Sequence, residues 1–260
     1  MPRFAANIST MFGEYPFLER IDQAAAWGFE GVECQFPYDT PAAEIADRLH
    51  SAGVSLVLLN APPGDLAAGD RGLATESERG GEFQRSIERA RAYALATACP
   101  RIHVMAGCRQ GPAAEDCFVE RIGWAADQVV GDGIDVLVEP MNHRDVPGYL
   151  LDGTAIALHL MDRIGRPNVK LQFDTYHLQI QQGDLVATLE GILSQVGHIQ
   201  FSSLPSRHEP DQGEVDHRWF FDRLDELGWA DWVGAEYRPR TTTADGLGWA
   251  QPYGIGPTPG

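Results

Sequence analysis

Apolar and polar positions follow two alternating rhythms along the chain. Short apolar runs of four to six residues are separated by longer segments in which apolar residues recur every three or four positions. The short runs are typical of buried strands and the longer segments of amphipathic helices. The predicted strands are Phe4–Asn7, Gly31–Gln35, Ser55–Asn60, Arg101–Met105, Ile134–Glu139, Val169–Asp174, His198–Phe201 and Trp232–Glu236. The predicted helices are Pro16–Trp27, Thr40–Ala52, Gly81–Ala98, Ala113–Val130, Thr154–Ile164, Asp184–Gln195, Asp216–Leu227 and Thr243–Trp249.

Several predicted helices are followed directly by glycine, for example Gly28 and Gly53. Glycine is common just past a helix C-terminus because it adopts the left-handed conformation without strain. Eight strand–helix units in a chain of this length predict an α/β fold, a single closed (β/α)8 TIM barrel. We expect the barrel to span residues 1–253 and residues 254–260 to form a disordered tail. A doubly wound sheet is the alternative, but Ile8–Gly13 lacks the glycine fingerprint that usually follows its first strand.

The charge balance narrows the classes of partner. Lys plus Arg total 20 and Asp plus Glu total 37 among 260 residues, a formal net charge of −17 at pH 7. The negative electrostatic potential of such a protein repels nucleic acid, so we expect no nucleic-acid partner. The most apolar run, Val54–Asn60, is too short to cross a bilayer, and the N-terminus lacks the apolar stretch of a signal peptide. We therefore expect a cytoplasmic protein without membrane contact, and we leave a homo-oligomer open.

The cysteines and the single lysine argue against two kinds of site. Cys34, Cys99, Cys108 and Cys117 show no C-x-x-C spacing, which disfavours a thiolate zinc site. Lys170 is the only lysine, so Schiff-base chemistry would have to use it. It lies four residues before its predicted strand ends, or about 13 Å below the catalytic face of a barrel. We interpret it as a structural residue.

The last four predicted strands all end in oxygen-bearing side chains. These are Glu139, Asp174, Gln200 and Glu236. The carboxyl ends of barrel strands meet at one face, where active sites lie, and clustered carboxylates would repel one another unless a cation neutralised them. Three carboxylates and one amide oxygen form a hard donor set that favours Mg²⁺ or Mn²⁺. Each residue taken alone could instead be an ordinary surface acid at a strand end.

Two long segments follow predicted strands at that same face, residues 61–80 and 204–215, and we interpret both as candidate lids. Arg207 in the second segment is our first choice for binding a substrate carboxylate, because a guanidinium matches that group. Arg71 in the first segment is the second choice. His177, three residues after a predicted strand end, is a candidate hydrogen-bond donor to substrate. A solvated arginine and a supporting histidine are the alternative interpretations.

Seven stretches along the chain resemble one family of enzymes: Met1–Asn7, Phe36–Tyr38, Val138–His143, Asp174–His177, Arg207–Pro210, Gly213–Glu214 and Glu236–Pro239. They are similar to the hydroxypyruvate isomerases, which belong to the xylose isomerase-like barrels. The resemblance implies conversion of hydroxypyruvate to tartronate semialdehyde, with Glu139 and Glu236 as catalytic glutamates. Residues 204–211 also resemble the 2-oxo-tetronate isomerase branch. Many relatives carry Asp where this chain has Ser203.

The predicted site suits such an isomerase. The reaction moves one proton between neighbouring carbons through an enediol, which calls for an acid–base pair and for stabilisation of negative charge by a cation. We expect Glu139 and Glu236 to act jointly as acid and base on a small sugar acid. The alternatives are an endonuclease IV-like hydrolase, which would need a basic groove and a histidine-rich zinc site, and a non-catalytic barrel that binds sugar acids.

Overall fold

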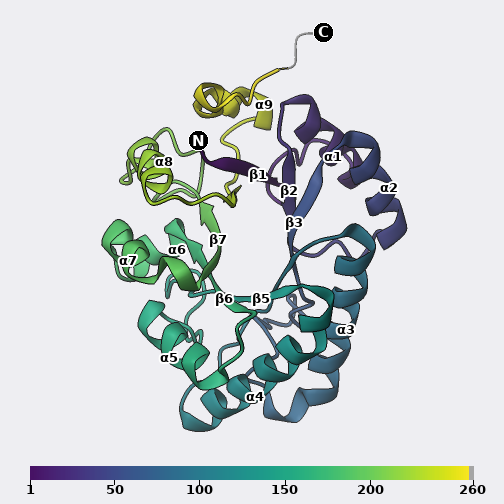
Figure 1. The fold of residues 1–260 in the computed structure, drawn as a ribbon, viewed down its shortest axis with the longest axis vertical. Helices are drawn as coiled ribbons and strands as arrows, with labels where there is room; N and C mark the ends of the chain where they lie inside the picture. The colour runs from purple at the N-terminus through teal and green to yellow at the C-terminus, as the bar shows by residue number, and fades with distance from the viewer. Residues whose placement is uncertain (258–260) are drawn as a thin grey trace.

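The strands close into one barrel in which every neighbouring pair is parallel (Figure 1). The computed structural model describes residues 1–257. The strands run in sequence order around the barrel: β1 (Arg3–Asn7), β2 (Gly31–Cys34), β3 (Ser55–Asn60), β4 (Arg101–His103), β5 (Asp135–Val138), β6 (Val169–Asp174), β7 (Val196–Phe201) and β8 (Trp232–Ala235). Strand β1 pairs with both β2 and β8, which completes the closure. The predicted (β/α)8 fold is confirmed.

Helices form the outer ring of the molecule (Figure 1). The α-helices are α1 (Phe17–Ala26), α2 (Ala42–Ala52), α3 (Gly80–Thr97), α4 (Pro112–Val129), α5 (Thr154–Ile164), α6 (Thr175–Gln181), α7 (Leu185–Ile192), α8 (His217–Glu226) and α9 (Thr243–Gly246). Short 3-10 segments are η1 (Ser77–Arg79), η2 (Val130–Asp132), η3 (Leu193–Gln195) and η4 (Leu247–Tyr253). None of the helices within residues 1–257 has both the length and the apolar character to cross a membrane.

Two helical segments differ from the sequence prediction. Helix α6 lies where no helix was predicted, and Asp174 caps it by accepting a hydrogen bond from the Tyr176 backbone N–H at 2.9 Å. An aspartate at that position satisfies one of the backbone donors at a helix start. The predicted helix Thr243–Trp249 is a single α-helical turn that continues as the 3-10 segment η4.

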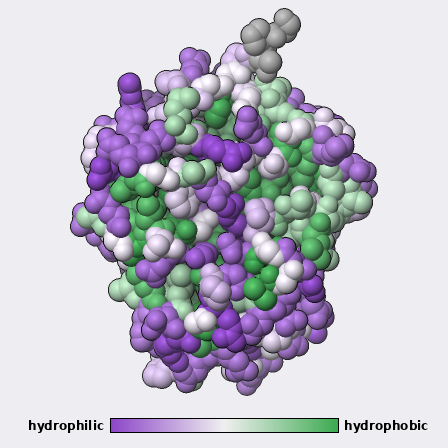
Figure 2. All heavy atoms as spheres, in the orientation of Figure 1, coloured by the Kyte–Doolittle hydropathy of each residue, from purple (hydrophilic) through white to green (hydrophobic). Residues whose placement is uncertain are grey.

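The inside of the barrel changes character along its axis. At the amino ends of the strands an apolar cluster closes the floor, and the Trp232 ring lies so close over Gly31 that a Cβ there would be 2.7 Å from it. Lys170 is at this end, packed against Gly197. Toward the carboxyl ends the buried interior becomes polar, with Asn7, Glu33, His103, Gln172, His198 and Gln200. Polar residues also occupy the centre of the face in Figure 2.

The end of the chain packs against its beginning. Phe4 of β1 makes edge-on ring contacts with Trp249 and Tyr253 of η4. Beyond η4, Ile255 is buried, and the Gly256 N–H donates to the carbonyl of Trp27 at 2.9 Å. The predicted disordered tail is therefore wrong for residues 254–256, because Ile255 finds an apolar site beside α1. Residues 258–260 of that prediction lie outside the described part of the chain.

Candidate active site

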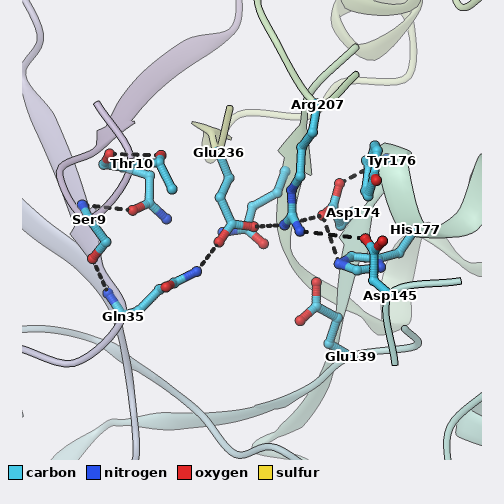
Figure 3. Close-up of polar contacts among 12 residues, drawn as sticks. Ser9, Thr10, Gln35, Glu139, Asp145, Asp174, Tyr176, His177, Arg207 and Glu236 are labelled. Carbon is cyan, nitrogen blue, oxygen red and sulfur yellow. Dashed lines mark hydrogen bonds and ion pairs between the residues drawn. The ribbon is translucent and has the colours of Figure 1, made fainter. Parts of the chain in front are cut away.

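The four predicted cation ligands lie at the carboxyl ends of adjacent strands. Glu139 follows β5 directly, Asp174 ends β6, Gln200 is the penultimate residue of β7 and Glu236 follows β8. All four are buried, between 1% and 5% exposed. Figure 3 shows Glu139 facing Asp174 and Glu236 across one central space. The strand ends thus bring these side chains to a single site, while their role as cation ligands stays a prediction.

Glu139 is the least satisfied of the carboxylates. Its Oε1 is buried and has no hydrogen-bond partner within the described chain. Its Oε2 lies 3.6 Å from His103 Nε2, and both ring nitrogens of His103 also lack partners there. Burial raises the pKa of Glu139 well above its ordinary value, and the charges of Asp174 and Glu236 raise it further. Burial lowers the pKa of His103 to about 3, so this imidazole is neutral at pH 7.

Asp174 has one satisfied and one unsatisfied oxygen. Its Oδ1 caps α6, whereas its buried Oδ2 has no hydrogen-bond partner among residues 1–257. Burial raises the pKa of Asp174 to about 7, against the opposing effect of the Arg207 guanidinium. One donor atom each from Glu139, Asp174 and His177 lie within 4.8 Å of one another. The two carboxylates of this cluster are thus close enough to share one cation.

Glu236 differs because protein groups bind both of its oxygens. Oε1 accepts a hydrogen bond from Gln35 Nε2 at 2.5 Å, and Oε2 accepts one from Arg207 Nη2 at 3.0 Å. Burial raises the pKa of Glu236, and the Arg207 charge opposes this shift. Gln35 lies just after β2 and was not singled out in the sequence, although it follows a strand end as the predicted ligands do.

Arg207 enters the centre of the carboxylate cluster. Its Nη2 lies 3.0 Å from Glu236 Oε2 and 3.7 Å from Asp174 Oδ2, and the guanidinium carbon lies 4.8 Å from the centre of the Tyr176 ring. The backbone there is left-handed, with φ of 55°. A tight turn holds it, in which the Arg207 N–H donates to the Ser203 carbonyl at 2.8 Å. The predicted substrate-binding arginine therefore reaches the site, where its one positive charge lies between two acids.

Ser203 helps to hold the turn around Arg207. Its backbone N–H donates to the His208 carbonyl at 3.0 Å, and its Oγ accepts from the His208 N–H at 3.2 Å. The hydroxyl thus stabilises the turn as a hydrogen-bond acceptor. It contributes no charge to the site.

His177 on α6 is positioned as a donor. Its Nδ1 accepts a hydrogen bond from the backbone N–H of Asn142 at 3.1 Å, and a backbone N–H can only donate. Burial lowers the pKa of His177 well below its ordinary value, so the ring is neutral and its one proton lies on Nε2. That atom is 3.7 Å from Asp174 Oδ2. A protonated Nε2 cannot bind a metal, which fits the predicted role of His177 as a hydrogen-bond donor to substrate.

Arg71, the second candidate for binding substrate, lies apart from this cluster. Its guanidinium donates to the backbone carbonyls of Leu66 at 3.3 Å and Asp70 at 2.7 Å, both in its own loop. These contacts fold the loop on itself. The structure does not bring Arg71 to the carboxylates.

Glu33 is a further buried acid at the site that the sequence analysis did not select. It lies on β2 below the cluster and is 0% exposed. Its Oε1 accepts a hydrogen bond from Gln200 Nε2 at 2.6 Å. The available signal was a charged residue inside the otherwise apolar run Gly31–Cys34, since buried acids are rare unless they are paired.

Comparison with known proteins places this geometry in a family. The model of the xylose isomerase-like TIM barrel family matches residues 21–253. The chain belongs to that family.

Three relatives of this xylose isomerase-like barrel match nearly its whole length. A 2-oxo-tetronate isomerase of Cupriavidus necator is 45% identical over 97% of this chain and 99% of its own. A hydroxypyruvate isomerase of Escherichia coli K12 is 40% identical over 97% of this chain and 100% of its own. A crystal structure named AP endonuclease, family 2, from Brucella melitensis has a TM-score of 0.95 at 48% identity, covering 97% of this chain and 99% of that one. The first two confirm the predicted resemblance and the enzyme class, an isomerase.

Proposed function

We propose that this protein is a metal-assisted isomerase that interconverts hydroxypyruvate and tartronate semialdehyde. The observation that carries the proposal is the pair of buried oxygens, Glu139 Oε1 and Asp174 Oδ2, that have no hydrogen-bond partner among the described residues and face one space with Glu236. Buried polar atoms without partners are costly. A site built this way gains stability from a cation and a polar substrate.

The side chains at this site suit a hard divalent cation. Glu139, Asp174, Glu236 and the amide oxygen of Gln200 would hold Mg²⁺ or Mn²⁺ through oxygen atoms alone. Burial raises the pKa of all three carboxyls, and the charges of neighbouring acids raise each of them further, so a cation here would relieve both effects. When bound, the cation would stabilise the negative charge that develops on the neighbouring substrate oxygens.

The chain's own residues supply the proton transfer. One of the two glutamates, Glu139 and Glu236, removes a proton from C3 of hydroxypyruvate, and the other acid–base group returns a proton to C2. The C3 hydroxyl loses its proton and the C2 oxygen gains one, so the enediol becomes the aldehyde with no change in composition. Burial raises the pKa of both carboxyls above their ordinary values, which makes each a stronger proton acceptor.

Two further side chains orient the substrate. Arg207 binds the substrate carboxylate with its guanidinium, which then shares its charge between the substrate and Glu236. His177 donates its Nε2 proton to a substrate oxygen. Arg71 has no place in this scheme, because its guanidinium is held by its own loop.

Isomerisation of 2-oxo-tetronates is the second candidate function. It is favoured by the 45% identity to the relative of that name, against 40% for the hydroxypyruvate isomerase. Cleavage of DNA, suggested by the name of the Brucella structure, is disfavoured by the net charge of −17 and by a cluster with a single histidine.

A coupled assay tests the proposal. The purified protein is given hydroxypyruvate, 2-oxo-tetronates or DNA with an abasic site, each with Mg²⁺ or Mn²⁺ and with a chelator. We expect cation-dependent turnover of hydroxypyruvate and no DNA cleavage. A higher kcat/KM for the 2-oxo-tetronates would favour the second candidate, and tight sugar-acid binding without turnover would point to the non-catalytic barrel.

A further inference from the structure

Glu33 is a buried acid whose hydrogen-bonding needs are met entirely inside the barrel. Its Oε1 accepts hydrogen bonds from Asn7 Nδ2 at 3.0 Å and Gln200 Nε2 at 2.6 Å. Its Oε2 lies 2.6 Å from His198 Nε2. Three side chains from β1 and β7 therefore surround one carboxylate on β2, directly below the candidate active site.

The barrel has room for the Glu33 carboxylate because the neighbouring residue on β8, Gly234, has no side chain. A Cβ at that position would be 2.3 Å from Glu33 Oε2. Such an approach is far inside van der Waals contact, so position 234 must be glycine while Glu33 keeps its place. The Glu33 carboxylate is thus accommodated by the backbones and side chains of four strands.

The carboxylate determines which way the amide of Gln200 points. Gln200 Nε2 donates to Glu33 Oε1 at 2.6 Å, and the same oxygen accepts from Asn7 Nδ2 at 3.0 Å, so Gln200 turns its NH₂ group toward Glu33. The Gln200 carbonyl oxygen then faces the other way, where it accepts a hydrogen bond from Gln172 Nε2 at 2.6 Å. A carbonyl oxygen has a second lone pair, and this is the atom through which Gln200 would bind a cation.

We infer that Glu33 is a positioning residue that fixes the Gln200 amide so that its oxygen, not its nitrogen, faces the cation. The inference rests on the proposed function, because it assigns a supporting role at the same site. Residues of this kind behind a metal ligand contribute a factor of about 10–100 in metal affinity. A merely structural Glu33 would affect folding and leave cation affinity unchanged.

The test compares the Mn²⁺ affinity of the wild-type protein and of Glu33→Gln by titration calorimetry, beside thermal unfolding of the metal-free proteins. Glutamine has the same size but both donates and accepts, so it no longer dictates the Gln200 amide. We expect Kd for Mn²⁺ to rise by about 10–100-fold and the Tm of the metal-free protein to change little.

Two further variants sharpen the test. Asn7→Ala removes another hydrogen bond to the same Glu33 oxygen but leaves the Gln200 contact, so its Kd should stay within about threefold of wild type. The double exchange Glu33→Gln with Gln200→Glu keeps the charge and places a carboxylate at position 200, whose oxygens need no orientation. We expect it to recover the wild-type Kd. If Glu33→Gln does not fold, the Mn²⁺ affinity of the double exchange alone tests the positioning role.

The outcomes separate this inference from the proposed function. Equal Kd in wild type and Glu33→Gln, or a folded double exchange that still binds Mn²⁺ weakly, would overturn the positioning role alone. A wild-type protein that binds no Mn²⁺ would overturn the proposed cation site and this role with it. If Glu33→Gln binds Mn²⁺ weakly and the double exchange restores the affinity, both the positioning role and the proposed cation site are supported.

Discussion

Two buried glutamates in the same barrel have opposite surroundings. Glu33 and Glu139 are both almost completely enclosed, at 0% and 3% exposed. Three protein side chains form hydrogen bonds with Glu33. Glu139 instead has one oxygen without a hydrogen-bond partner in the described chain, and its other oxygen lies 3.6 Å from the neutral His103 ring. Burial alone therefore does not mark a reactive acid. The unsatisfied oxygen of Glu139 is what distinguishes the two glutamates, and it is the reason that we propose a cation and substrate beside Glu139.

The largest loss of activity should come from Glu139→Gln, which removes the carboxylate whose Oε1 has no hydrogen-bond partner. Loss of an acid–base group lowers kcat by about 10²–10⁴-fold. The Tm of the metal-free protein should not fall much, because the change removes a poorly accommodated acid. Steady-state kinetics and thermal melts measure the two effects, with Glu236→Gln run alongside. Turnover within tenfold of wild type in both variants would refute the acid–base assignment.

The pH dependence of stability should reveal the raised pKa of the buried Asp174 carboxyl. The ordinary pKa of an aspartate carboxyl is 3.8, and burial raises that of Asp174 to about 7. Between these values the folded protein holds a proton that the unfolded chain has released, so the free energy of unfolding falls as pH rises, by up to about 1.4 kcal/mol per pH unit. Thermal melts in chelator from pH 4 to pH 7 measure this slope, and Asp174→Asn should flatten it. An unchanged slope in that variant would rule out Asp174 as its source.

Removal of the Arg207 side chain should weaken substrate binding. A hydrogen bond to a charged group contributes about 1.5–3 kcal/mol, so Arg207→Ala should lower kcat/KM by about 10–100-fold, mainly through KM. Arg71→Ala is the matched control, because the Arg71 guanidinium donates to two carbonyls of its own loop and lies apart from the carboxylates. It should stay within about twofold of wild type. Equal losses in the two variants would contradict the different roles that we assign to them.

The hydrogen bonds around Glu33 can be disturbed by a substitution at Gly234. Alanine there forces the Glu33 carboxylate away from His198, and overpacking of this kind costs about 1–3 kcal/mol of unfolding free energy. For a chain of this size each kcal/mol lowers Tm by about 2–4 °C. Gly191→Ala on α7 is the control, since no atom outside its own helix lies within 4 Å of the added Cβ. Similar melting of Gly234→Ala and wild type would show that the carboxylate can shift freely.

The sequence predicted the fold and the acids at the strand ends for the same reason. Two periodicities locate the strands, and parallel strands in a barrel bring their carboxyl ends to one face. Glu139, Asp174 and Glu236 stand at those ends, so their meeting follows from the topology. Glu33 could not be selected in this way, because its importance lies in contacts with Asn7 and His198 that only the closed barrel creates.

Side-chain direction explains the remaining differences between prediction and structure. Arg207 was correctly expected near the site, but its pairing with Asp174 and Glu236 depends on a left-handed residue in a tight turn. Position along a loop does not reveal such a conformation. The packing of Ile255 was likewise not predicted, because the segment is held partly by the hydrogen bond from Gly256 to Trp27, more than two hundred positions earlier.

The pairing of β1 with β8 has a consequence for how the molecule is made. During synthesis the first strand leaves the ribosome more than two hundred residues before its second neighbour, Trp232–Ala235, exists. Until then β1 presents an open row of backbone donors and acceptors, the kind of edge that recruits stray strands and promotes aggregation. Translation speed and chaperone access therefore bear on the yield of this enzyme, and circular permutants that make β1 and β8 contiguous should reach the native state with less dependence on both.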